Sequence, residues 1–94
     1  MSLNHILYAF EIVPGKNDLL QFAETLEDAR TGALEQRAEI RLDEPDFGNL
    51  APMAIYRVEV QLPDIGTLVK VMNDEIDLCE ACVVDRRLVG FVVD

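Results

Sequence analysis

The spacing of apolar residues changes repeatedly along this 94-residue chain, and the order of the changes predicts a fold. Residues 4–13 predict a strand that is mostly apolar on both faces, and a Pro-Gly pair would end it. Helical spacing follows over 19–29, strict alternation over 37–42 and 53–62, and helical spacing again over 65–76. The β-branched segment 78–94 predicts either one bulged strand or two short strands that separate near 85–87.

The predicted order is therefore β-α-β-β-α-β, with a loop over 43–52. Two right-handed crossovers would place both helices on one face of a four-stranded antiparallel sheet, which is the ferredoxin-like arrangement of the α+β class. A weak internal repeat supports two similar halves, because a shift of 49 residues aligns Pro14 with Pro63 and Leu19 with Leu68. The length predicts a single domain over 1–94.

The charge balance limits the classes of partner. The chain has 18 acidic residues against 8 basic ones, a net charge of −10, so it lacks the basic surface that nucleic acids and anionic membranes require. No apolar run approaches the ~18 residues of a membrane span, and the first residues lack the features of a signal peptide. We therefore expect a cytoplasmic protein that binds neither nucleic acid nor membrane.

The two cysteines form a Cys-x-x-Cys spacing within the predicted last strand. Side chains three apart in a strand point to opposite faces, so Cys79 and Cys82 would lie ~10 Å apart, which is too far for a disulfide. A closed zinc site usually takes four Cys or His ligands, whereas the chain offers two cysteines and one histidine. We therefore expect no metal and no other cofactor, and interpret the cysteines as small apolar residues.

The strand phases suggest one polar constellation. If the apolar faces of 37–42 and 53–62 meet the helices, the opposite face displays Arg37, Glu39, Arg41, Ile55, Arg57, Glu59 and Gln61. The first strand adds His5 and Glu11 if its Leu7 and Ala9 face is turned the same way.

Two interpretations of this constellation stay open. Its charges could form cross-strand ion pairs. Alternatively they could line a pocket in which Arg57 or Arg41 holds a carboxylate or phosphate and His5 or Glu11 moves a proton, with Glu59 beside the anchoring arginine. Residues 85–87, "DRR", are a second candidate anion site or a solvated bulge. No residue is assigned a catalytic role.

The segment "YAFEIVPGKNDLLQFAETLEDARTGAL" resembles the dimeric α/β-barrel superfamily, particularly its antibiotic-biosynthesis-monooxygenase-type members. The resemblance lies in a strand followed by Pro14-Gly15-Lys16, an acid at Asp18 and an amphipathic helix. It implies a ferredoxin-like protomer and a homodimer whose sheets pack into a barrel. This chain lacks the Trp that many members carry on the third strand, and its histidine is on the first strand, so no catalytic residue carries over.

A second resemblance lies in "LPDIGTLVKVM", which is similar to ACT domains, regulatory modules that bind amino acids at dimer interfaces. Three hypotheses follow: a homodimer that holds a small organic molecule, as a binding protein or an enzyme; an ACT-like amino-acid sensor; and a subunit that mediates protein contacts. A homodimer or higher homo-oligomer is expected in each case, because a chain this small with apolar residues on both faces of its first and last strands needs extra burial.

Overall fold

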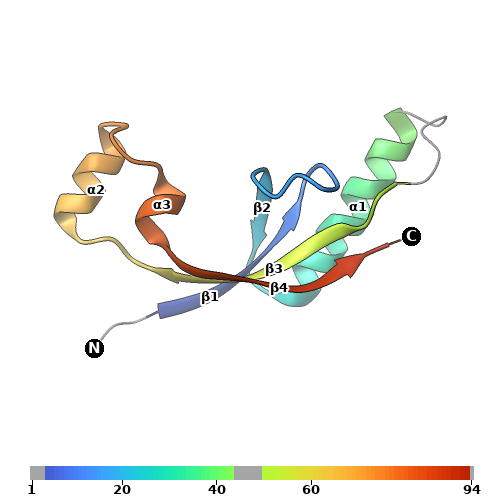
Figure 1. Ribbon diagram of the computed structural model, residues 1–94, viewed down its shortest axis with the longest axis horizontal. Helices are drawn as coiled ribbons and strands as arrows, with labels where there is room; N and C mark the ends of the chain where they lie inside the picture. The colour runs from blue at the N-terminus through green and yellow to red at the C-terminus, as the bar shows by residue number, and fades with distance from the viewer. Residues whose placement is uncertain (1–3, 44–49, 94) are drawn as a thin grey trace.

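The computed structural model describes residues 4–43 and 50–93 and shows an α+β chain (Figure 1). All strand pairings are antiparallel, and the four strands lie in the order β2-β1-β3-β4. The α+β class and the four-stranded antiparallel sheet are thus confirmed, whereas most of the loop predicted over 43–52 lies outside the described residues. The elements are β1 (Asn4–Glu11), β2 (Leu20–Ala23), α1 (Leu26–Asp43), β3 (Met53–Gln61), α2 (Ile65–Met72), α3 (Leu78–Cys82) and β4 (Val83–Val92).

The ferredoxin-like order is wrong. It requires a helix directly after the first strand, whereas β1 is followed by the hairpin strand β2, and α1 comes only after β2. The Pro14–Gly15 pair opens a hairpin loop and not a helix: Gly15 has a φ of 86°, and the Ile12 amide donates to the Leu19 carbonyl across the loop. The described residues contain three helices instead of the expected two.

Helix α1 begins seven residues later than predicted and absorbs the strand predicted over 37–42. The hydroxyl of Thr25 accepts a hydrogen bond from the Asp28 amide, 3.0 Å away, and so caps the first turn. The helix continues through Gly32, where an added Cβ would lie 2.6 Å from the Phe10 ring. Glycine therefore lets α1 pack closely against β1 at this point, and the helix continues past residue 29, where the predicted helical spacing ends.

The core lies between α1 and one face of the sheet. Its buried cluster contains two alanines of the helix and four larger side chains of the strands: Phe10, Ala29, Ala33, Met53, Ile55 and Val92. Arg37 is also buried, and its guanidinium donates to the carbonyl oxygens of Leu50 and Ala51. This arginine ties the residues that precede β3 to the helix, which is why a charged side chain lies inside.

The predicted strand 53–62 is confirmed as β3, and the helix predicted over 65–76 is confirmed over the span of α2. The last strand is the bulged single strand of the two alternatives, but it begins at Val83. Its register shifts twice against β3, and the shifts leave Val84 and Val89 without partners in the ladder. Residues 78–82 form the short helix α3 instead of the start of a strand.

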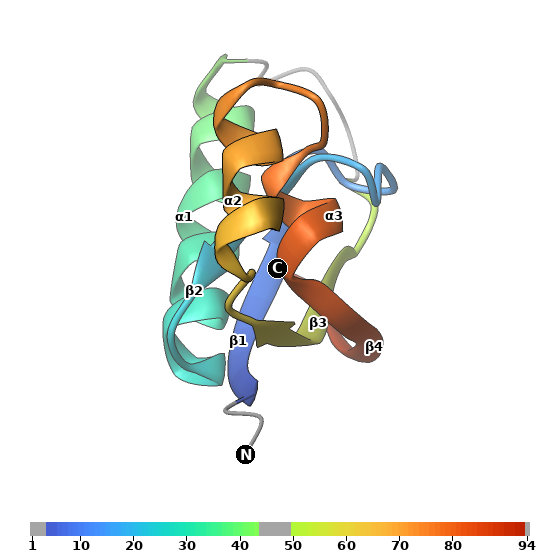
Figure 2. The ribbon, with the colours of Figure 1, turned by 90° about the vertical axis from the view of Figure 1, so that its left-hand side faces the viewer.

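The long helix and the two short helices lie near opposite ends of the molecule. Helix α1 lies at one end of the molecule, and the α2–α3 segment (residues 65–82, here called the arm) projects at the other end (Figures 1 and 2). The structure measures 49 × 27 × 16 Å, so it is elongated. No described helix is both long enough and apolar enough to cross a membrane.

We call the side of the sheet that packs on α1 the α1 face and the other side the open face. Residues that pair directly across antiparallel strands share a face. By this rule the open face is mostly apolar and also carries three titratable side chains, of which Glu11 is buried. Its apolar residues are Ala9, Leu20, Phe22, Ala54, Tyr56, Val58, Leu88 and Phe91, with Leu7 beside the arm, and the titratable ones are His5, Glu11 and Arg86.

Candidate functional site

The arm is a helical hairpin with defined ends. The Asp64 carboxylate caps α2 by accepting a hydrogen bond from the Thr67 amide, 2.7 Å away, and this bond holds the pKa of the carboxyl below its usual value. A turn with Asp74 at a φ of 59° follows, and α3 then leads directly into β4. Every residue of both helices is described, and none of them is buried.

An apolar hollow of about 450 Å³ separates the arm from the open face. We call it the arm hollow. Its walls come from β1, β2, the end of β3, both arm helices and the start of β4, so distant segments of the chain build it together. The lining residues are Leu7, Phe22, Val60, Gln61, Leu62, Pro63, Leu68, Leu78, Cys79, Cys82 and Val83.

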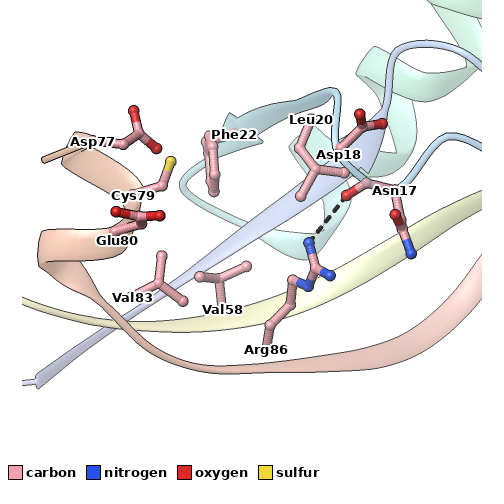
Figure 3. Close-up of a pocket in the computed structure, with 10 residues that line it drawn as sticks. All are labelled: Asn17, Asp18, Leu20, Phe22, Val58, Asp77, Cys79, Glu80, Val83 and Arg86. Atoms are coloured by element: carbon pink, nitrogen blue, oxygen red, sulfur yellow. Dashed lines mark hydrogen bonds between the residues drawn. The ribbon is translucent and has the colours of Figure 1, made fainter.

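A second hollow of about 440 Å³ adjoins the first and shares Phe22, Cys79 and Val83 with it (Figure 3). We call it the rim hollow because polar side chains join the lining. Val58 and Leu20 add apolar surface, and the polar residues are Asn17, Asp18, Asp77, Glu80 and Arg86. The rim hollow thus sets three carboxylates against one guanidinium.

Arg86 holds the rim hollow together on the side away from the arm. Its Nη1 donates to the Asn17 carbonyl oxygen over 3.0 Å (Figure 3). Its guanidinium carbon also lies 4.9 Å from the centre of the Tyr56 ring, a cation–π distance. Arg86 therefore joins the β1–β2 loop to β4 and β3, which gives the "DRR" segment a structural role at this residue.

The cysteines do not lie in a strand, which corrects the prediction. Both belong to α3, where a separation of three residues places them on one side of the helix. Both are free thiols. The pKa of the Cys79 thiol is raised, mainly by burial and to a smaller extent by the charge of Asp77 and by the neighbouring Cys82. Within 4–43 and 50–93, no group of three or more His, Cys, Asp or Glu side chains is arranged to hold a metal ion.

The residues predicted for an anion site are spread over the molecule. Arg57 and Glu59 lie on the α1 face, beyond the area that α1 covers. Glu59 accepts a hydrogen bond from Asn4 over 3.0 Å, and Asp85 pairs with Arg87 over 2.9 Å. Among the residues that the structure describes, half-buried Arg57 has no hydrogen bond or ion pair, so it does not take part in the cross-strand ion pairs that were one of the two interpretations.

The other three candidates do not join Arg57. Glu11 is buried, and its Oε1 accepts hydrogen bonds from the amides of Ala54, at 2.7 Å, and Gly15, at 3.3 Å, so it connects the hairpin to β3. His5 is exposed at the start of β1, on the open face and thus opposite Arg57. Arg41 is exposed in the last turn of α1. The condition that placed all of them on one face is not met.

The two hollows were missed because the sequence pattern says which side chains avoid water but not what they pack against. Leu68 and Leu78 lie at apolar positions that predict burial, yet each stays partly exposed beside the arm hollow. A smaller hollow of about 210 Å³ adjoins the start of α2, within the segment that resembles ACT domains. There the Asp64 carboxylate already occupies the Thr67 amide.

Comparisons with protein-family models, with curated proteins and with solved structures found no match for this chain. The two family resemblances therefore stay predictions, and function is argued from the geometry of the arm, the hollows and the open face.

Proposed function

We propose that this protein binds a small organic molecule, largely apolar, in the arm hollow. The observation that carries the proposal is the hollow itself: about 450 Å³ of space lined by apolar side chains, with Gln61 as the exception. Ligand pockets in proteins typically measure about 300–1,000 Å³ and are lined mainly by apolar groups with a few polar ones. A ligand there would contact both Leu68 of the arm and Leu7 of the sheet, and so would join the two.

The rim hollow indicates the polar end of such a ligand. Asp77 and Glu80 stand on the arm side of the rim, opposite Arg86 (Figure 3). Carboxylates outnumber the guanidinium there, and the whole chain carries a net charge of −10. An anionic group would therefore meet repulsion, whereas a neutral or cationic group would be accepted. We propose a molecule with an apolar body in the arm hollow and a neutral or cationic group at the rim.

The proposal concerns binding alone. The reactive side chains that line the arm hollow are the amide of Gln61 and the two thiols. The raised pKa of Cys79 keeps that thiol protonated near neutral pH, and a protonated thiol is a poor nucleophile.

Titration with Nile red, a neutral apolar dye, tests the proposal. We expect saturable binding of one dye per chain, weakened about tenfold or more by Leu68→Lys, because the substitution places a charge in the wall of the hollow. Leu42→Lys is the matched control, since Leu42 is 80% exposed near the end of α1 and lines neither hollow. Equal binding by both variants, or binding that never saturates, would contradict the proposal. If the dye binds as expected, native mass spectrometry of the protein from its own source would reveal the natural ligand.

A second candidate is the protein-contact subunit. The observation that favours it is the exposed apolar surface of the open face and arm, which includes Phe91 and Met72.

A further inference from the structure

We propose that a second copy of this chain covers the open face and that the arm of each protomer belongs to the same interface. This inference does not rest on the proposed ligand, because it concerns the part of the open face that lies away from the arm hollow and those residues of α2 that do not line it.

The two areas of the sheet that α1 leaves uncovered differ in polarity. On the α1 face, the area beyond α1 carries polar side chains such as Arg57, Glu59 and Arg87, which are suited to water. On the open face, Arg86 lies over the ring of Tyr56, whereas Leu88 is 52% exposed and Phe91 is 60% exposed. The α1 face thus presents polar groups to solvent in this area, whereas β4 leaves large apolar side chains of the open face in contact with water.

The arm exposes a row of large apolar side chains. Ile65, Val69 and Met72 follow one another at helical spacing and form an apolar stripe along α2. Ile65 is 78% exposed and Met72 is 76% exposed, although Asp64 and Lys70 supply the polar groups that a solvated helix needs. The protomer itself therefore provides nothing that covers this stripe.

The protomer exposes more surface than a compact monomer of its mass. The chain exposes 6652 Å², whereas a monomer of 10.6 kDa is expected to expose about 5,500 Å². Its radius of gyration is 15.4 Å, against about 12 Å for a compact chain of this length. The excess of roughly 1,200 Å² is enough for a stable interface, which takes about 800 Å² from each partner.

A second copy fits these surfaces better than a different protein does. The open face and the α2 stripe are both apolar, and both lie on the side of the sheet that α1 leaves free. A twofold dimer uses the same surface of each protomer, so one interface buries both features twice. A basic partner would find no exposed carboxylate on the described strands of the open face, because Glu11 is buried there, and Arg86 would repel it.

Sedimentation equilibrium of the whole chain at micromolar concentration tests the inference. We expect a dimer whose dissociation constant rises about 100-fold or more with Phe91→Lys, in the open face, and likewise with Met72→Lys, in the arm. Both side chains are exposed in the protomer, so far-ultraviolet circular dichroism should show that each variant stays folded. Leu42→Lys, at the opposite end of the molecule from the arm, should leave the dimer intact.

A wild-type chain that sediments as a 10.6 kDa monomer at these concentrations would overturn the inference. A dimer that resists Phe91→Lys would show that the open face is not the interface, and one that resists Met72→Lys would remove the arm from it. Nile red binding by a monomeric Phe91→Lys variant would leave the ligand proposal standing, so the two proposals fail separately.

Discussion

The contact between Gly32 and Phe10 can be tested by adding one methyl group. In Gly32→Ala the new Cβ would lie 2.6 Å from Cε1 and 2.9 Å from Cζ of the ring, whereas carbon atoms in contact lie about 3.5–4.0 Å apart. The ring is 3% exposed and belongs to the core cluster, so it has little space to move. Overpacking of this kind costs about 1–3 kcal/mol, and the better helix propensity of alanine returns about 1 kcal/mol. We expect a net loss of up to about 2 kcal/mol.

The assay is thermal and urea unfolding, followed by circular dichroism. For a domain of this size, a loss of 1 kcal/mol lowers Tm by roughly 4–8 °C. Gly66→Ala is the matched control, because the new Cβ would meet only the Asp64 carboxylate at 3.6 Å, an ordinary contact. That variant should match the wild type or exceed its stability.

A double-mutant cycle identifies the ring as the cause. Phe10→Leu removes the atoms that the new methyl group would meet, so Gly32→Ala should cost less in that background than in the wild type. Gly32→Ala that leaves stability unchanged or raises it, while Gly66→Ala behaves the same way, would refute the close approach of α1 to β1.

Three further predictions follow from single side chains. Glu11→Ala should lower the free energy of unfolding by about 2–3 kcal/mol in urea titrations, because the buried amide of Ala54 loses its acceptor at 2.7 Å; a loss below 0.5 kcal/mol would contradict this role. Arg57→Ala should change stability by less than about 0.5 kcal/mol, since the described structure gives this arginine no partner; a drop of several degrees in Tm would show that it has one. In a Cys82→Ala variant, the iodoacetamide reaction of Cys79 should depend on pH with a midpoint above that of a free thiol, because its raised pKa keeps the thiolate scarce; fast alkylation at pH 7 would contradict it.

The elements that could be predicted are those whose apolar period is sustained for eight or more residues. β3 alternates over its full length and was placed to within one residue, and α2 was placed at its first residue. β2 has only four residues, and Leu20 and Phe22 fit a strand as well as a helix. The sequence of the hairpin that contains β2 therefore predicts the start of a helix, and the predicted order of elements is wrong at that point.

The segment 37–42 failed for a different reason. Its alternation of charged and apolar residues indicates a strand, but Arg37 and Ile40 continue the helical stripe that begins with Ala29 and Ala33. The pattern counts arginine as a surface residue, whereas this guanidinium is buried because the carbonyls of Leu50 and Ala51 satisfy it. A tertiary partner that the local sequence does not show therefore decided the secondary structure.

The candidate site shows the same limit at larger scale. The hydrophobic spacing correctly predicts a helix that contains Leu68 and Met72, and the apolar residues of such a helix are expected to be buried. In the protomer, Leu68 is 37% exposed beside the arm hollow, whereas Met72, in the apolar stripe of α2, is 76% exposed. The pattern records that these side chains avoid water, but it does not record whether the cover is the same chain, a ligand or a second copy. Helix α1 packs on the other face of the sheet, so apolar side chains of the open face and the arm stay exposed. The two proposals differ in what covers them: a ligand covers the side chains that line the arm hollow, and a second protomer covers the rest.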